Sequence, residues 1–407
     1  MSFEQALSGL NAASKNLEVI GNNVSNASTV GFKGSRAEFA DVFANSLSGG
    51  GASQIGIGTK ISSVQQQFTQ GNITASSNTM DTAINGGGFF RMDDNGAISY
   101  SRNGQFELDK SGYIVDAQGK RLTGFSATNG VLSTGSPVDL KINTADLSPN
   151  ATTKVTAQIN LDSTNTALTA AGFSPTDPTT YNNSTSVTVY DSLGNSHTLE
   201  SFFVKTGAGT WDVFSTADGT STTTLPAPNA TLTFSGTGTS PTINPATPTI
   251  SIPVSTGATS PLAVKMDLSG STQFGSTFSV NSITQDGYTS GKLSSFSTGS
   301  DGTILGSYSN GQSLKLGQVA LANFVNPNGL SSLGNNAWAE TAVSGAPLVG
   351  TPGTSSLGVL QASATEDSNV DLTAELVNMI TAQRVYQANA QTIKTEDQVL
   401  QTLVSLR

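Results

Sequence analysis

The two ends of this chain carry the same apolar spacing, although most of the sequence lies between them. Near the N-terminus, apolar residues recur at alternating steps of four and three, at Phe3, Leu7, Leu10, Leu17 and Val24. Near the C-terminus the spacing returns at Leu372, Leu376, Met379, Tyr386, Ala390, Ile393, Leu400 and Val404. This is the a/d pattern of helices that wrap around other helices. We therefore expect the chain to join something by its two ends.

Local signals place the limits of both helices. Ser2 and Gln5 form a capping-box pattern at the start of the first, which should stop by Gly31. Ser368 and Asp371 form a similar pattern at the start of the last, which should run to about Leu406.

The last helix has more apolar surface than one neighbour can cover. Beside its main seam it carries a second apolar flank at Val377, Ile380, Val385, Val399 and Leu406. A helix that is apolar on more than one side needs more than one neighbour. Packing between subunits is therefore favoured over an ordinary core. The predicted assembly interface comprises Phe3, Leu7, Leu10, Leu17, Val24, Leu372, Leu376, Met379, Tyr386, Ile393, Leu400 and Leu403.

The middle of the chain has the pattern of short strands and tight turns. Turn pairs such as Asn95-Gly96 and Asn103-Gly104 separate alternating segments, and Asp301-Gly302 and Asn310-Gly311 repeat the pattern later. A Thr/Pro-rich region between them has strand pairs of its own. The expected fold class is mainly β with α-helical coiled-coil termini, in nested domains. The expected domains are a terminal coiled-coil inner domain (1–30 plus 369–407), a connecting segment (31–70 plus 358–368), a β domain (71–146 plus 286–357) and an inserted outer β domain (147–285).

Composition excludes several classes of protein. The 407 residues are long enough for two to four domains, only 11% are charged, and the net charge is −10. This charge argues against nucleic acid or an anionic membrane as a partner. With no cysteine there is no disulfide framework. The start of the chain lacks the basic and apolar regions of a cleaved signal, and no apolar run has the length of a membrane span.

The candidates for enzyme chemistry are weak. His197 is the single histidine and lies beside an expected turn, where a surface role is usual. The segment 93–96 (Asp-Asp-Asn-Gly) fits a hairpin turn better than a calcium loop, because it lacks spaced oxygen ligands. Gly86-Gly87-Gly88 fits a tight backbone approach better than a phosphate cradle. We expect no catalytic residue, cofactor or metal site, and no enzyme.

Several motifs resemble a known family. The segment from Asn22 to Lys33 (Asn-Asn-Val-Ser-Asn, then Gly-Phe-Lys) resembles the N-terminal signature of bacterial flagellar rod and hook axial proteins. Ser25 replaces the usual alanine of that signature. The resemblance continues in 67–71, 81–90, 100–106 and 368–407, so it covers both ends and much of the middle. The signature residues are Asn22, Asn23, Asn26, Gly31, Phe32 and Lys33.

The resemblance implies a function. Within the family a large inserted outer domain is typical of hook-type members, and 147–285 has the size and place for it. A hook-type member implies a homopolymer, a flexible hollow tube that acts as a universal joint between motor and filament. It implies an extracellular place in the flagellum, on the basal body. The implied partners are a hook cap protein, a distal rod protein, a hook–filament junction protein and the flagellar type III export apparatus. The alternatives are a distal-rod-type axial component, a secreted β-rich adhesin or a carbohydrate-acting enzyme.

Overall fold

The computed structural model describes residues 2–42 and 56–405, which form two compact units. Unit 1 comprises Met1–Thr144, Ser295–Ser307 and Ser313–Arg407, and unit 2 comprises Ala145–Ser294 with Tyr308–Gln312. The chain is mostly β, with one long helix at each end. Part of the expected connecting segment (43–55) and the expected helix residue Leu406 lie outside the described residues.

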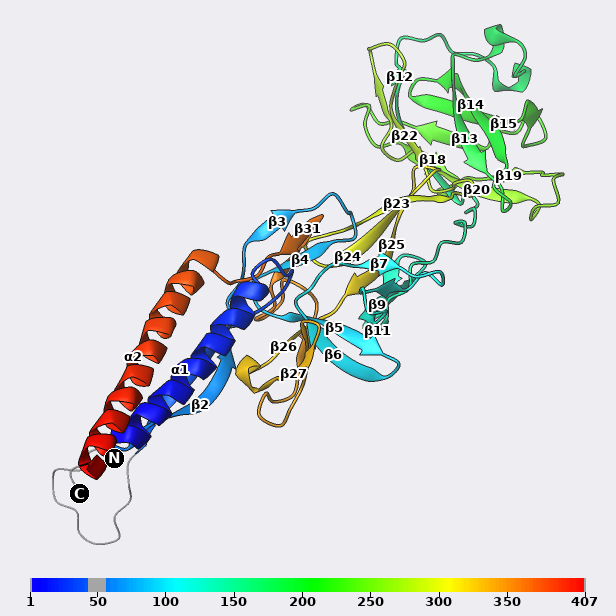
Figure 1. Ribbon diagram of the computed structural model, residues 1–407. Coiled ribbons are helices and arrows are strands. Elements are labelled where there is room, and N and C mark those ends of the chain that lie inside the picture. Colours follow the sequence, from blue (N-terminus) through cyan, green and yellow to red (C-terminus); the bar gives the residue numbers. More distant parts are fainter. Residues whose placement is uncertain (1, 43–55, 406–407) are drawn as a thin grey trace. The chain divides into compact units, whose positions relative to one another are not determined.

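The terminal helices α1 (Ser2–Ser25) and α2 (Leu372–Ser405) pack side by side and run in opposite directions (Figure 1). The expected start of the last helix near Ser368 is wrong. Asp371 caps α2, because its Oδ1 accepts hydrogen bonds from the backbone N–H groups of Thr373 (2.9 Å) and Ala374 (3.1 Å). The Ser368 hydroxyl instead accepts from the N–H of Val370 within a local turn.

Unit 1 contains a long hairpin and two short strand pairs besides its main sheet. The hairpin consists of β1 (Ser35–Val42) and β2 (Gly58–Gln66), and α1 packs against both strands. The short pairs bring both halves of the chain together: β3 (Ile73–Ala75) with β31 (Ala364–Glu366), and β4 (Thr82–Asn85) with β30 (Val359–Ala362).

The main sheet of unit 1 mixes early and late strands. Its central order is β23-β24-β25-β9-β5-β6-β28-β27, so late strands flank early ones on both sides. Its aromatic core joins Phe89, Tyr100, Phe324 and Trp338, and Phe68 packs edge-on against Phe89 and Trp338. The strands are β5 (Phe89–Asp94), β6 (Ala97–Ser101), β7 (Glu107–Leu108), β8 (Ile114–Val115), β9 (Arg121–Thr128), β10 (Val131–Leu132), β11 (Val138–Asp139), β23 (Leu293–Thr298), β24 (Thr303–Tyr308), β25 (Ser313–Val319), β26 (Leu321–Asn323), β27 (Ser331–Gly334), β28 (Ala337–Ala339) and β29 (Leu348–Gly350), with a short 3-10 helix η3 (Pro327–Gly329).

Unit 2 consists of a five-stranded and a six-stranded sheet that share a core. Side chains such as Val155, Leu199 and Trp211 are fully buried in it, and Phe173, Phe202 and Phe214 form a second cluster. The expectation that this region has strand pairs of its own is confirmed, and Val187 lies opposite Leu199 in one of them. The strands are β12 (Lys154–Asp162), β13 (Asn183–Tyr190), β14 (Ser196–Gly207), β15 (Thr210–Ala217), β16 (Thr220–Ser221), β17 (Ala230–Thr233), β18 (Thr242–Asn244), β19 (Thr249–Ile252), β20 (Leu262–Asp267), β21 (Thr272–Phe274) and β22 (Ser279–Gln285), with η1 (Ala170–Gly172) and η2 (Pro178–Thr180).

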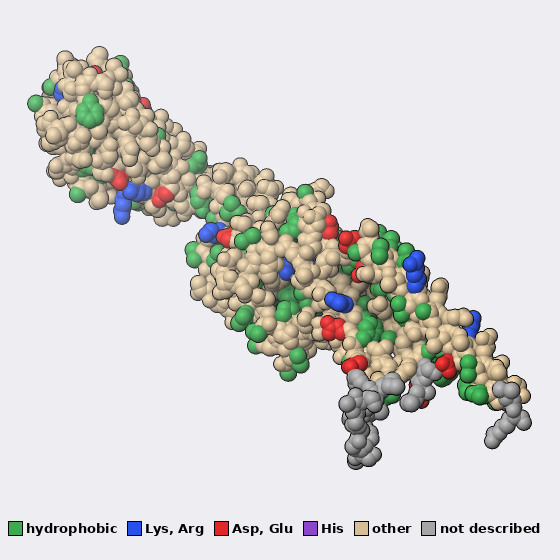
Figure 2. All heavy atoms as spheres, turned by 90° about the vertical axis from the view of Figure 1, so that its left-hand side faces the viewer, with side chains coloured by type: hydrophobic (Ala, Val, Ile, Leu, Met, Phe, Trp, Pro, Cys, Tyr) green, Lys and Arg blue, Asp and Glu red, His purple; other side chains and the backbone are tan. Residues whose placement is uncertain are grey.

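On the face drawn in Figure 2, most of the surface is neither charged nor hydrophobic. Figure 2 shows one face on which charged side chains are sparse, as the charged fraction of 11% predicts. Among the helices of the described residues, none is long and apolar enough to span a membrane.

Candidate assembly interface and its junction with the β sheet

The most deeply buried residues of α1 lie outside the predicted heptad seam. Ala6, Ala13 and Ile20 are the buried apolar residues of α1. At Gly9 a side chain would meet the Asn389 amide of α2 within 3 Å, so the two helices approach closely there. Towards the hairpin, the Ser8 hydroxyl accepts from the N–H of Thr59 at 3.2 Å. The helix therefore faces α2 on one side and β2 on another.

The predicted seam of α1 is only partly covered. Phe3 and Leu7 are each 43% exposed, whereas Leu10, Leu17 and Val24 are partly buried. An interface between subunits at these positions stays a prediction. Their exposure leaves apolar surface for a further neighbour.

The predicted seam of α2 is more exposed still. Met379 and Ile393 are partly buried, and Ala382 is the buried residue of this helix among those described. The other large apolar side chains of α2 lie more than a third exposed: Leu372, Leu376, Val377, Ile380, Val385, Tyr386, Val399, Leu400, Leu403 and Val404. Monomeric proteins seldom leave so long an apolar stripe uncovered.

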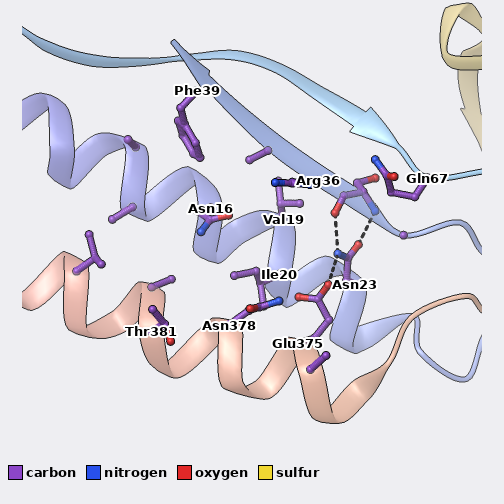
Figure 3. Close-up of a pocket in the computed structure, with 18 of the residues that line it drawn as sticks. Asn16, Val19, Ile20, Asn23, Arg36, Phe39, Gln67, Glu375, Asn378 and Thr381 are labelled. Carbon is purple, nitrogen blue, oxygen red and sulfur yellow. Dashed lines mark hydrogen bonds between the residues drawn. The ribbon is translucent and has the colours of Figure 1, made fainter. Parts of the chain in front are cut away.

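An open groove of about 930 Å³ lies between α1, α2 and β1 (Figure 3). Ile20, Asn378 and Thr381 are among the side chains that line it. At one end of the groove, the Asn23 amide contacts both β1 and α2.

The signature asparagines have different roles. Asn22 is exposed. Asn23 is 2% exposed: its Oδ1 accepts from the Ser35 N–H at 2.8 Å, and its Nδ2 donates to the Ser35 carbonyl at 2.8 Å and to Glu375 Oε1 at 3.2 Å. Asn26 donates from Nδ2 to the Asn22 carbonyl at 3.0 Å, at the end of α1. Asn23 therefore joins α1 to the first residue of β1 and to α2.

The Gly-Phe-Lys part of the signature enters a buried ion cluster. Gly31 has φ +70°, and a side chain there would meet the backbone of Asn103 at 2.7 Å. Phe32 is partly buried. Lys33 is fully buried, and its Nζ donates to Glu366 Oε1 at 2.6 Å and to the Thr69 carbonyl at 2.8 Å.

Glu366, at the end of β31, has a second cationic partner. Its Oε2 accepts from Arg102 Nη1 at 3.1 Å, and its Oε1 also accepts from the Gly71 N–H at 2.9 Å. Burial lowers the pKa of Lys33 and that of Arg102, and the Glu366 charge opposes both shifts. We call Lys33, Arg102 and Glu366 the junction triad.

Sequence reasoning missed Glu366, the ion-pair partner of Lys33, and two further residues around it. Arg102 and Asn369 lie in segments that resemble the family, but neither was identified as a site residue. Asn369 Oδ1 accepts from the Gly34 N–H at 2.8 Å, and its Nδ2 donates to the carbonyls of Gln67 and Thr69. Sequence spacing carries no signal for these contacts, because their partners lie about 300 positions away.

The residues weighed as candidates for enzyme chemistry have structural roles in the fold. The expectation that His197 is a surface turn residue is wrong: it lies in β14, is 8% exposed, and its Nδ1 is 2.7 Å from Asp218 Oδ2. Asp93 supports the expected hairpin turn by accepting from the Gly96 N–H at 2.6 Å. At Gly86 a side chain would meet the Gly358 backbone at 2.9 Å, as expected of a tight backbone approach. The described residues contain no group of three His, Cys, Asp or Glu that could hold a metal.

Four family models match successive parts of the chain. The model of a "Flagella basal body rod protein" matches residues 3–33, and that of the "Flagellar hook protein FlgE/F/G D1 domain" matches 83–172. The "Flagellar basal body protein FlaE D2 domain" matches 160–288, and the "Flagellar basal body rod FlgEFG protein C-terminal" matches 361–406.

Curated relatives match over the whole length. The chain is 43% identical to the flagellar hook protein FlgE of Escherichia coli (strain K12) and 44% identical to that of Salmonella typhimurium, with all of both chains covered. It is 32% identical to FlgE of Borreliella burgdorferi, covering 100% of this chain and 99% of the relative.

A solved structure shares the fold. The crystal structure of Helicobacter pylori flagellar hook protein FlgE2 covers 71% of this chain and 99% of its own, with a TM-score of 0.54 at 15% sequence identity. At that identity the likeness bears on the fold alone. Sequence similarity over the full length decides the family: the chain belongs to the flagellar hook protein family.

Proposed function

We propose that the chain is the structural subunit of the flagellar hook and assembles into a flexible hollow tube that transmits motor torque to the filament as a universal joint. The observation that carries assembly is the exposed apolar stripe of α2, together with Phe3 and Leu7 on α1. Burying such side chains between copies stabilises a polymer by roughly 25 cal/mol per Å² of apolar surface. The interface would comprise the predicted seam residues of both helices.

The proposal assigns different roles to different parts of the chain. The terminal helices would form the inner tube. The connecting segment, the β domain and the outer domain expected from the sequence would lie at successively larger radii. Weakly charged polar surfaces on the β parts would make contacts that break and re-form at small cost, so that the tube could bend. The proposed place is extracellular, on the flagellum.

The proposed partners follow from a hook-type role. They are the hook cap protein during assembly, the distal rod protein below, the hook–filament junction protein above, and the type III export apparatus. A distal-rod-type component remains a second candidate, because two of the matching family models describe basal body rod proteins. Unit 2 favours the hook-type role, since a large inserted domain distinguishes hook-type members. The family models and the relatives described above are flagellar proteins, so we set the adhesin and carbohydrate-enzyme alternatives aside.

Electron microscopy of the concentrated, purified chain tests the proposal. Curved hollow tubes are expected. Straight, rigid tubes would instead support the rod-type role, and a chain that stays monomeric at high concentration would contradict assembly through the helices.

A further inference from the structure

We propose that Glu366 is a positioning residue that sets how the two terminal helices are attached to the β sheet, by serving as the shared counter-charge of Lys33 and Arg102. The inference rests on the proposed function, because the attachment angle matters for a subunit that must fit a helical lattice. Its stability test does not depend on polymer formation.

The charge balance of the junction triad makes Glu366 the least replaceable member. The side chains of Lys33 and Glu366 are fully buried and that of Arg102 is 5% exposed. Two cations share one anion, so the cluster carries a net charge of +1. Loss of Lys33 would leave a neutral pair, whereas loss of Glu366 would leave two buried cations without a counter-charge. An unpaired buried charge is strongly destabilising.

The position of the triad in the chain makes it a point of attachment for both helices. Lys33 follows the end of α1, and Glu366 precedes the start of α2. The Gly31 N–H donates to the Glu366 carbonyl at 2.7 Å, so the two linkers are joined through backbone as well as side chains. Arg102 directly follows β6, so its ion pair ties Glu366 to the sheet, and its Nη2 donates to the Gly86 carbonyl at 2.8 Å.

Further hydrogen bonds hold the linker before α2 next to the junction triad. The Asp367 N–H donates to the Asn72 carbonyl at 2.8 Å, and the Asn369 side chain binds the first linker and the segment after β2. These bonds secure the linker to α2 on the side of Glu366 that faces the helix. The carboxylate is therefore the point where the linkers of both helices and the sheet are bound together.

The test compares Glu366→Gln with the double variant Lys33→Met/Glu366→Gln in the full chain. Glu366→Gln preserves shape and removes the counter-charge, so its melting temperature should fall by about 10 °C. The double variant carries one buried cation instead of two and should recover part of that loss. If Glu366 contributes only packing, the decreases in melting temperature caused by Glu366→Gln and by Lys33→Met add. The double variant then shows no recovery. A double variant no more stable than Glu366→Gln, including failure of both to fold, would overturn the inference.

The polymer gives the second readout. Glu366→Gln should assemble with an altered helical rise or twist, or not at all, whereas Glu107→Gln, the same change at an exposed position of β7, should assemble as the wild type does. An unchanged lattice in Glu366→Gln would refute the positioning role. If wild-type chain itself formed no tubes, the proposed function would fail, and the melting-temperature recovery would still decide the charge balance.

Discussion

Asn23 joins three chain segments through a single amide group. Its oxygen and nitrogen bind both backbone groups of Ser35, and the nitrogen also reaches Glu375 on α2. A buried amide in such a position is costly to replace, because loss of either function leaves a buried partner without a hydrogen bond. The neighbouring Asn22 has the same side chain but is exposed.

This pair predicts unequal effects for the same substitution. Asn23→Asp removes the donor and places a carboxylate beside Glu375, so it should cost about 2 kcal/mol of stability. Asn22→Asp should change stability by less than about 0.5 kcal/mol. Hydrogen exchange of the α1 amides measures both, and equal effects would contradict the structural role assigned to Asn23.

Asp191 predicts the acid sensitivity of unit 2. Burial by itself would raise the pKa of this carboxyl, but hydrogen bonds from Asn195, Thr256 and the Leu193 N–H outweigh burial and hold the pKa below its usual value. The folded state therefore gains stability above the unfolded pKa of about 4 and loses it as the pH falls below that value.

The measurement is thermal unfolding of unit 2 between neutral and acid pH. Asp191→Asn should lower stability at pH 7 by about 2 kcal/mol, because the amide replaces one acceptor oxygen by a donor. The stability of Asp191→Asn should also decrease less than that of the wild type as the pH is lowered. Asp146→Asn, at an exposed position, serves as the control. An unchanged acid dependence in Asp191→Asn would show that other groups cause it.

At the scale of elements, α2 has more apolar surface than its neighbours in the chain cover. The part of α1 that faces it is rich in small residues such as Gly9 and Ala13, which allows a close approach but buries little side-chain area. Packing of a long helix on such a narrow surface stabilises it weakly. Its remaining apolar side chains are the part of the molecule best suited to contact other copies.

Leu376 provides the test at this scale. Because the side chain is 45% exposed, Leu376→Asp should change the stability of the isolated chain by less than about 0.5 kcal/mol. In the polymer the same change would bury a carboxylate without a partner, so assembly and motility should be lost. Leu376→Met keeps the apolar character and should assemble. Normal assembly of Leu376→Asp, measured by sedimentation of polymer, would remove this position from the proposed interface.

At the scale of the whole molecule, unit 2 is an insertion whose ends meet. Leu147 and Gly291 form an antiparallel bridge, with hydrogen bonds of 2.7 and 3.2 Å between their backbone groups. A two-residue turn can join such a pair. Unit 2 has its own core, so its removal should leave the core of unit 1 intact.

Replacement of residues 148–290 by Asn-Gly should therefore give a folded chain that still forms tubes. If the outer part of the subunit supplies the contacts that permit bending, these tubes should be straighter than those of the full chain. Circular dichroism checks the fold, and electron microscopy measures curvature. Tubes with unchanged curvature would place the flexible contacts within unit 1.

The sequence by itself determined the classes of element and the family. Alternating residues and Asn-Gly turns predicted hairpins such as β5–β6, because turn chemistry and strand alternation are local properties. Heptad spacing predicted both helices for the same reason. The start of α2 was misplaced, since Ser368 and Asp371 are both capping residues and only the contacts of the linker decide between them.

Only the tertiary structure decided which residues of the signature hold the molecule together. It separated buried Asn23 from exposed Asn22, and it paired Lys33 with Glu366 and Arg102. It also placed Gly9 against Asn389 and Asn23 against Glu375 where α1 meets α2. The physical reason is that burial and ion pairing depend on segments far apart in the chain, which local patterns do not encode.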